Sequence, residues 1–257
     1  METILAQPTG AQPDRPGISY DKREDISYFK GFDWLKASKE ECIHFARATG
    51  FKETGMSVNE VGLMYDLLEE KKPKTIVELG RNYGTSTRLF LAYMMKHDLF
   101  YRKDGSNEIN SNHAVLDSWD LKHWDGFIET MRDNGYVFCS LGRSCFVDGK
   151  FYTTVIRDDA HSIKTDIPPY LVQRGVDFLL IDTEHAIENA LPEYCRWREY
   201  LNSGALIAFH DSTLPAVARS IEIILEMEGK DRPGRIDKIH KNECEDGFGI
   251  CILEWKG

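Results

Sequence analysis

From Lys74 onward, short apolar runs alternate with segments that have helical periodicity. This alternation is typical of βαβ units, in which helices join parallel strands and cover the sheet. It predicts strands over Thr75–Leu79, Ala114–Asp117, Thr153–Arg157, Val176–Asp182 and Ala205–His210. It predicts helices over Thr85–Lys96, Trp124–Asn134, Pro192–Leu201 and Pro215–Gly229. Two last apolar runs, Arg235–His240 and Phe248–Trp255, predict an antiparallel pair at the edge of the sheet.

Two capping boxes precede this region, Ser38 with Glu41 and Ser57 with Glu60. In a capping box the serine and the acidic residue each satisfy a backbone N–H at the start of a helix. We therefore expect a helix after each serine. The whole pattern predicts a flexible tail over residues 1–19, a helical appendage over 20–56, and an α/β domain over 57–257.

Two segments do not fit the alternation of strands and helices. They are the polar stretch 98–112 and the stretch 145–152, which contains an Asp148-Gly149 turn signal. We interpret both as surface insertions, with a substrate-gripping loop as the alternative.

The charge balance narrows the range of functions. The 257 residues contain 32 Lys+Arg and 42 Asp+Glu, so the formal net charge is −10. Nucleic acids and anionic membranes attract basic surfaces, and neither is expected as a partner. Hydrophobic residues make up 42%, enough for a packed core, but the apolar runs are of strand length and do not predict a membrane span.

The N-terminus has neither a basic segment nor an apolar segment of the kind found in secretory signals, so we expect a cytoplasmic protein. The cysteines show no C-x-x-C spacing and favour buried, reduced thiols over disulfides or a zinc site. They are Cys42, Cys139, Cys145, Cys195, Cys244 and Cys251.

A cofactor signal follows the first predicted strand, where Glu78 leads into a turn with Gly80 and Gly84. The G-x-x-x-G spacing differs from the G-x-G-x-x-G spacing that dinucleotides require. The second predicted strand ends at Asp117, whose carboxylate suits the paired hydroxyls of a ribose. Ligands of open parallel sheets bind at the carboxyl ends of the strands, where all four residues are expected to lie.

Four segments resemble class I S-adenosylmethionine (SAM)-dependent methyltransferases, in particular macrocin-type O-methyltransferases and cephalosporin-hydroxylase-like proteins. They are Val77–Ser86, Asp117–Trp119, Asp177–His185 and Gly204–Asp211. The resemblance extends over Ser57–Glu228. It implies a Rossmann-like, doubly wound, seven-stranded and mostly parallel sheet with an antiparallel C-terminal edge strand and helices on both faces. It also implies that SAM contacts Glu78, Gly80, Gly84, Thr85, Ser86, Asp117, Trp119 and Asp158. For Asp158 a solvated loop is the alternative.

The resemblance places the fourth and fifth predicted strands side by side, so that their ends lie about 5 Å apart. A divalent cation, Mg²⁺ or Mn²⁺, could then bind Asp182, His210 and Asp211, although related enzymes carry acidic or amide ligands where His210 stands. Asp182 also faces the methyl donor, and His185 is the candidate general base.

The implied activity is O-methyl transfer to a hydroxyl of a small molecule or a sugar-containing natural product. One alternative is an iron-dependent oxygenase built on His185, His210 and one aspartate, since two histidines and a carboxylate can form a facial triad. A non-catalytic SAM-binding module is the other. A homo-oligomer is left open.

Overall fold

The structure of the protein is a computed structural model. It describes residues 29–48, 55–100, 113–120, 131–133, 136–138, 145–147, 150–157, 162–231, 236–242 and 248–257. The predicted tail, most of the stretch 98–112 and most of the predicted helix Trp124–Asn134 lie outside these ranges. The division into an appendage and an α/β domain stays a prediction.

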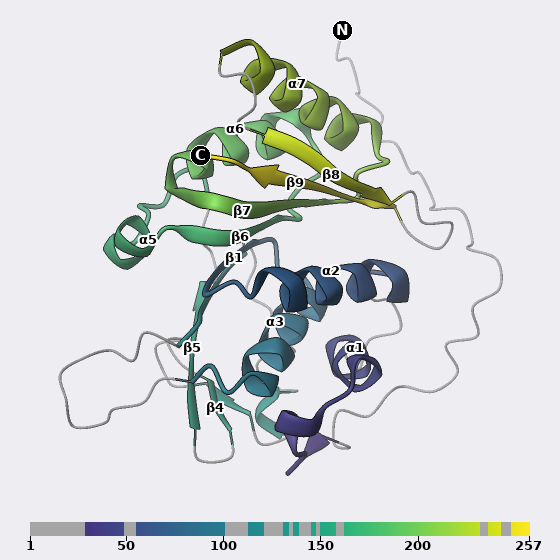
Figure 1. Cartoon of the computed structure of the whole chain (residues 1–257), viewed down its shortest axis with the longest axis vertical. Coiled ribbons are helices and arrows are strands. Elements are labelled where there is room, and N and C mark those ends of the chain that lie inside the picture. Colours follow the sequence, from purple (N-terminus) through teal and green to yellow (C-terminus); the bar gives the residue numbers. More distant parts are fainter. Residues whose placement is uncertain are drawn as a thin grey trace, which may run out of the picture.

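One mixed sheet, ordered β3-β4-β5-β2-β1-β6-β7-β9-β8, runs through the molecule (Figure 1). Its parallel strands are β1 (Thr75–Leu79), β2 (Val115–Trp119), β5 (Lys150–Arg157), β6 (Val176–Ile181) and β7 (Leu201–His210). The C-terminal strands are β8 (Ile236–Asn242) and β9 (Ile250–Trp255), and β9 is antiparallel to both β7 and β8. These seven strands confirm the predicted Rossmann-like sheet.

A short ribbon at the other edge adds β3 (Val137–Phe138) and β4 (Cys145–Val147), both antiparallel to their neighbours. The prediction that 145–152 is a surface insertion is therefore wrong. β4 pairs antiparallel with Lys150–Tyr152 of β5, so this segment belongs to the sheet, while Asp148 and Gly149 lie outside the described residues.

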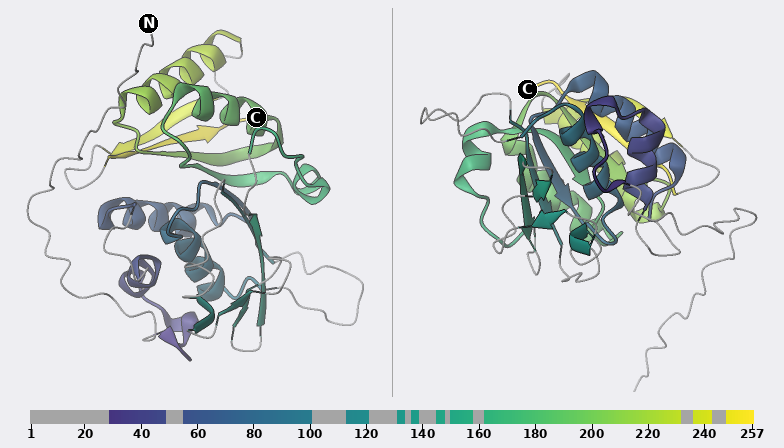
Figure 2. Two further views of the ribbon diagram at one scale, coloured as in Figure 1. Left: turned by 180° about the vertical axis from the view of Figure 1, so that it is seen from behind. Right: turned by 90° about the horizontal axis from the view of Figure 1, so that it is seen from below.

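Helices cover both faces of the sheet (Figures 1 and 2). On one face lie α1 (Lys39–Arg47), α2 (Val58–Lys71), α3 (Thr85–Lys96) and the 3₁₀ turn η2 (Trp34–Lys36). On the other lie α5 (Pro169–Arg174), α6 (Ile187–Trp197), the 3₁₀ turn η3 (Arg198–Tyr200) and α7 (Pro215–Asp231). Alternate strand residues point to opposite faces, so Ile76 and Val77 belong to two separate hydrophobic clusters.

Both predicted capping boxes are confirmed. Ser38 and Ser57 are the N-caps of α1 and α2, and in each box the backbone N–H of the serine donates to a glutamate oxygen at 2.7 Å. The glutamates' own N–H groups donate to the serine hydroxyls at 3.1 and 3.2 Å. The helix starts were therefore readable from local residues alone.

Two predicted boundaries are wrong, namely the start of the helix placed at Pro192 and the start of the strand placed at Ala205. Proline is common in the first turn of a helix, which favoured a start at Pro192. α6 instead begins at Ile187, and the N–H groups of Asn189 and Ala190 donate to the carbonyl of Ala186 at 3.1 and 3.2 Å. β7 begins at Leu201 rather than Ala205, and its pairing with β6 shifts register near Val176.

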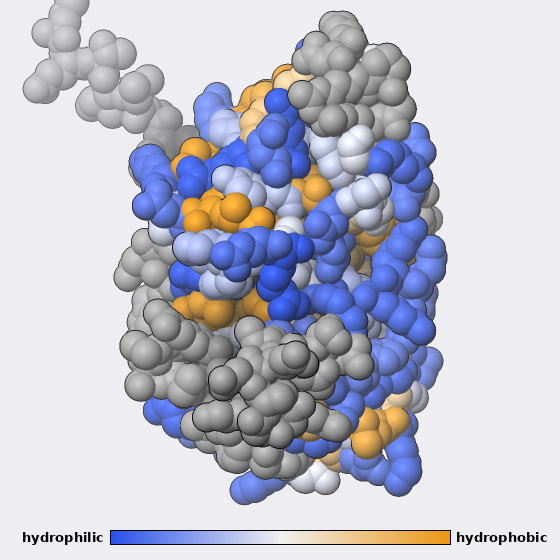
Figure 3. Space-filling model, turned by 60° about the vertical axis from the view of Figure 1, so that its left-hand side comes forward, coloured by the Kyte–Doolittle hydropathy of each residue, from blue (hydrophilic) through white to orange (hydrophobic). Residues whose placement is uncertain are grey.

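The molecular surface is predominantly hydrophilic in the view of Figure 3, where orange patches are small and separated by polar side chains. None of the described helices combines the length and the apolar character needed to cross a bilayer. Cys42 and Cys251 are buried thiols, as predicted, and Cys195 is half-buried, while Cys139 and Cys244 lie outside the described residues.

Gly80 joins the end of β1 to the end of β6. It has a φ of +88°, and a Cβ at this position would lie 2.0 Å from the carbonyl oxygen of Asp182. Its own N–H donates to the carbonyl of Trp119 at 2.8 Å, at the end of β2. Only glycine fits this close approach of three strand ends.

We expect Gly80→Ala to lower the free energy of unfolding by at least ~2 kcal/mol, because the methyl group would collide with backbone that cannot move aside. Gly229→Ala, in α7 with nothing within 4 Å of the new methyl group, should raise it by up to ~1 kcal/mol. Chemical denaturation measures both. Equal stability of the Gly80 variant and the wild type would contradict the assigned contact.

Candidate active site

Polar residues gather at the carboxyl ends of β6 and β7. Asp182 directly follows β6, and its N–H donates to the carbonyl of Leu79 in β1 at 2.8 Å. β7 ends at His210, and Asp211 follows it. Because β6 and β7 are paired parallel neighbours, these side chains meet at one edge, as the sequence predicted.

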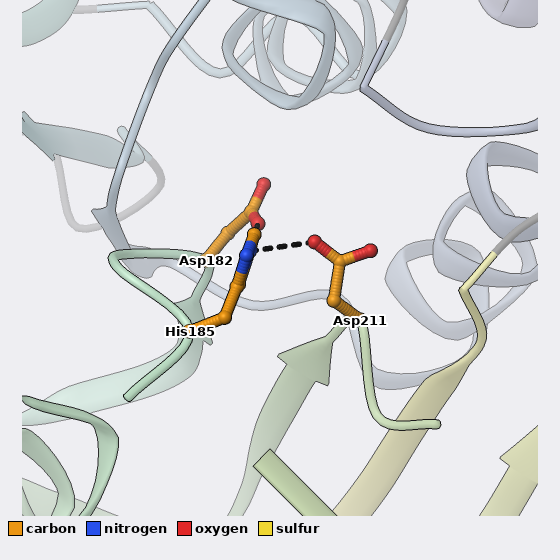
Figure 4. Close-up of side chains that lie close together, drawn as sticks. All are labelled: Asp182, His185 and Asp211. Atoms are coloured by element: carbon orange, nitrogen blue, oxygen red, sulfur yellow. Dashed lines mark ion pairs between the residues drawn. The ribbon is translucent and has the colours of Figure 1, made fainter. Parts of the chain in front are cut away.

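Two carboxylates and two imidazoles form a connected cluster there (Figure 4 shows three of the four). The Nε2 atom of His185 lies 2.6 Å from Oδ2 of Asp211 and 4.0 Å from Oδ1 of Asp182. The Nδ1 atom of His210 lies 3.0 Å from the same Asp182 oxygen and 3.3 Å from the same Asp211 oxygen. Each imidazole therefore faces both carboxylates.

The two imidazoles differ in depth. The His210 side chain is 2% exposed and lies beneath the carboxylates, whereas that of His185 is 44% exposed. One ligand atom from each of Asp182, His185 and Asp211 falls within 4.8 Å of the others, which is suitable for one cation. The structure brings the three predicted ligands Asp182, His210 and Asp211 together, and it adds the more exposed His185 to them.

The cluster strongly perturbs proton affinities. The carboxylates of Asp182 and Asp211 raise the pKa of His185 to about 9, against the opposing effect of burial. Burial lowers the pKa of His210, but the same carboxylates raise it well above its usual range overall. Although burial opposes ionisation of Asp211, the two histidines hold its pKa well below the usual range. The carboxylates therefore favour the protonated form of both imidazoles.

The backbone of Asp211 contributes to this geometry. Its φ is +55°, a left-handed conformation that non-glycine residues seldom adopt and that aspartate tolerates better than most. The turn closes with a hydrogen bond from the N–H of Leu214 to the carbonyl of Asp211 at 2.9 Å. Such strain is concentrated at functional positions, where the surrounding structure compensates for it.

The glycine turn after β1 is supported from below by Glu78. This fully buried carboxylate accepts hydrogen bonds from the hydroxyls of Ser86, Ser118 and Thr87, the last at 2.6 Å. Burial raises the pKa of Glu78, although the hydroxyls oppose this effect. Glu78 and Ser86 thus bind each other, and their predicted contact with a cofactor stays a prediction.

The carboxylate beside the glycine turn is that of Asp120, which sequence reasoning missed. One of its oxygens accepts from the backbone N–H of Arg81 at 2.9 Å and from that of Asn82 at 2.8 Å. Asp120 directly follows Trp119, the last residue of β2. A signal was present in the sequence, since a second aspartate follows Asp117 after two residues.

The prediction that Asp117 ends the second strand is wrong, because β2 continues to Trp119. Asp117 lies in mid-strand, and its oxygens accept from Nε of Arg157 at 2.7 Å and from its second nitrogen at 3.0 Å. The hydroxyl of Tyr170 in α5 also donates to Asp117. The Arg157 guanidinium covers the ring of Trp119 at 4.9 Å from the centroid. A cofactor role for Asp117 and Trp119 stays a prediction, and Asp158 lies outside the described residues.

Two further buried acids were also missed as site residues. Glu193 of α6 accepts from the hydroxyl of Thr183, next to Asp182, at 2.6 Å, and from that of Ser162. Glu60 of α2 lies 3.5 Å from Nε2 of His210. Its part in the capping box was readable from the sequence, but its contact with a strand more than a hundred residues away was not.

A family model described as a methyltransferase domain matches residues 77–212, more than half of the chain. The chain belongs to this family. The match begins in β1 and ends directly after Asp211, so it contains both the glycine turn and the carboxylate–imidazole cluster. The predicted resemblance to class I SAM-dependent methyltransferases is thereby confirmed.

Solved structures show the same fold in other methyltransferases. The chain is similar to an O-methyltransferase from Bacillus cereus in complex with SAH, with 12% identity, a TM-score of 0.52 and coverage of 90% of this chain and 100% of the other. It is also similar to TomG of Streptomyces achromogenes in complex with SAM, with 14% identity, a TM-score of 0.52 and coverage of 91% and 96%. No match is found among curated proteins.

We expect Asp117→Asn to lower the free energy of unfolding by about 3 kcal/mol, because it leaves the Arg157 charge unpaired in a largely buried site. Asp33→Asn, which removes a carboxylate from a solvent-exposed pair with Lys36, should leave the unfolding midpoint unchanged. Denaturant titration followed by circular dichroism compares the two variants. A stable Asp117 variant would mean that the pair does not hold β2, β5 and α5 together.

Proposed function

We propose that this methyltransferase-family protein transfers a methyl group from SAM to a hydroxyl of a small molecule or a sugar-containing natural product, assisted by a divalent cation. One observation carries the proposal: the backbone of Gly80 in the glycine turn meets the carbonyl of Asp182 in the carboxylate–imidazole cluster. A cofactor at the turn and an acceptor at the cluster would therefore be adjacent, as direct methyl transfer requires.

Three features of the turn support SAM as the cofactor. Gly84, the N-cap of α3, has a left-handed conformation and no side chain between a ligand and the helix N-terminus. Thr85 offers a buried hydroxyl that has no hydrogen-bond partner among the described residues. Asp120 supplies a carboxylate that suits two ribose hydroxyls. The bound cofactor would supply an electrophilic methyl group on a sulfonium.

The donor set also supports a divalent cation. Two carboxylates and one imidazole present ligand atoms within 4.8 Å, and the buried Oδ1 of Asp211 has no hydrogen-bond partner among the described residues. Asp182 and Asp211 would hold the ion, and their oxygen donors suit Mg²⁺ or Mn²⁺. A bound cation would lower the pKa of an acceptor hydroxyl.

The chain's own residues would orient the acceptor and receive its proton. Transfer from a sulfonium is a direct displacement, so in-line positioning supplies most of the rate enhancement, up to roughly 7–11 kcal/mol. His185 is the exposed imidazole of the cluster, but with a pKa of about 9 it carries a proton at pH 7. It could act as a base once another positive charge neutralises Asp182 and Asp211, which is the electrostatic reason to propose a cation.

The two alternatives receive less support from the geometry. An oxygenase centre on His185 and His210 needs open coordination positions beside both imidazoles, yet the His210 side chain is only 2% exposed. A non-catalytic module does not need a strained Asp211 beside an exposed imidazole. We therefore propose the enzyme.

We expect the wild-type protein to bind SAM with a Kd in the micromolar range, measured by calorimetry. Asp120→Asn should weaken binding about tenfold or more, because the amide still accepts from Arg81 and Asn82 but loses its charge toward the ribose. Asp66→Asn, on the exposed side of α2, should bind as the wild type does. Absence of wild-type binding at millimolar SAM would overturn the proposed function.

We expect His185→Ala to lower turnover about 100-fold or more, with little change in the affinity for SAM, because the imidazole would receive the proton of the acceptor hydroxyl. His97→Ala, which removes an imidazole paired with Glu69 at 3.0 Å, is the matched control and should leave turnover unchanged. Methyl transfer from labelled SAM to a panel of hydroxyl acceptors measures both variants. Unchanged turnover of the His185 variant would remove this residue from the mechanism.

A further inference from the structure

The two capping boxes have the same hydrogen bonds but opposite surroundings. Glu41 accepts from Ser38 at the exposed start of α1, and Glu60 accepts from Ser57 at the start of α2 with the same distance of 2.7 Å. Glu60 is fully buried. A capping glutamate does not have to be buried, as Glu41 shows. Burial removes the hydration of a carboxylate, and a partner must compensate for this cost. The cap alone does not explain where Glu60 lies.

The partner that explains this burial is His210. Nε2 of its ring lies 3.5 Å from Oε2 of Glu60, and both side chains are excluded from solvent. Neither Nε2 of His210 nor Oε1 of Glu60 has a hydrogen-bond partner among the described residues. The oxygen that faces His210, Oε2, also accepts from the N–H of Ser57, and at 3.5 Å its contact with the imidazole is an ion pair.

The opposite side of the same ring faces the reaction site. Nδ1 of His210 lies 3.0 Å from an oxygen of Asp182 and 3.3 Å from an oxygen of Asp211. A ring with a carboxylate next to each nitrogen cannot rotate without losing contacts on both sides. Its orientation in turn fixes the two carboxylates, and these carboxylates face His185.

We propose that Glu60 is a positioning residue of the reaction site, which through His210 holds the carboxylates of Asp182 and Asp211 toward His185. This inference rests on the proposed function, because it takes the cluster to be the reaction site. It gives α2 a role beyond covering the sheet: the N-terminus of this helix carries the acid that orients the end of β7.

The test compares Glu60→Gln with Glu41→Gln. In both variants the amide oxygen can still accept from the serine N–H, so the loss of helix capping is matched. Only Glu60→Gln replaces the carboxylate that faces His210 with an amide. Ring ¹⁵N signals of His185 and His210, assigned with His185→Gln and His210→Gln variants, provide a readout that needs neither an acceptor nor a bound cation.

We expect Glu60→Gln to shift the ring signals of His185, which Glu60 does not touch, and Glu41→Gln to leave them in place. Calorimetry with Mn²⁺ should show about tenfold weaker binding for Glu60→Gln only, as for other residues that orient metal ligands. If Glu60→Gln does not fold, Glu60→Asp, whose shorter side chain withdraws from His210, should shift the same signals.

Two outcomes would overturn the inference: His185 signals that do not respond to the Glu60 variants, and equal responses to Glu60→Gln and Glu41→Gln, which would indicate a general effect of capping. A wild-type protein that binds neither SAM nor Mn²⁺ would contradict the proposed function instead. The His185 signals would still decide the role of Glu60 in that case.

Discussion

The close approach of three strand ends is the constraint on which the rest of the structure depends. At Gly80 the backbone of β1 meets the carbonyl of Asp182 after β6 and hydrogen-bonds to the carbonyl of Trp119 at the end of β2. A side chain at this position would separate the strands. The absence of a Cβ therefore places the glycine turn, Asp120 and the carboxylate–imidazole cluster next to one another.

Buried charge serves two separate purposes in this protein. On the face covered by α5 and α6, Asp117, Arg157 and Tyr170 form a pair and a hydrogen bond that join two strands to a helix. At the carboxyl ends of β6 and β7, acids and imidazoles lie close enough to perturb each other's pKa values. The first group is satisfied internally, whereas the second leaves the His185 imidazole exposed at the surface.

Internal pairing and exposure distinguish structural side chains from candidate site residues better than their positions in the sequence do. Asp117 and Asp120 lie only three residues apart, yet one is enclosed in mid-strand and the other binds the backbone of the glycine turn. His185 follows β6 and His210 ends β7, yet the first is exposed and the second lies beneath the cluster. In each pair, depth in the sheet decides which side chain can meet a ligand.

Local interactions made much of the fold predictable. The limits of β1 and α3 and both capping boxes agree with the prediction, because periodicity and caps act over a few residues. The motifs likewise indicated that Asp182, His210 and Asp211 would meet, since carboxyl ends of parallel strands share one edge.

Only the tertiary structure decided what depends on register and on distant contacts. The length of β2 moved Asp117 into the sheet and left Asp120 at its end, which pairing with β1 and β5 determines. The packing of α2 against the end of β7 brought Glu60 to His210. The sequence by itself determined which acids and imidazoles were present and on which elements they lie. Their depth, partners and charge state follow from how those elements pack, because burial and proximity arise only in the folded chain.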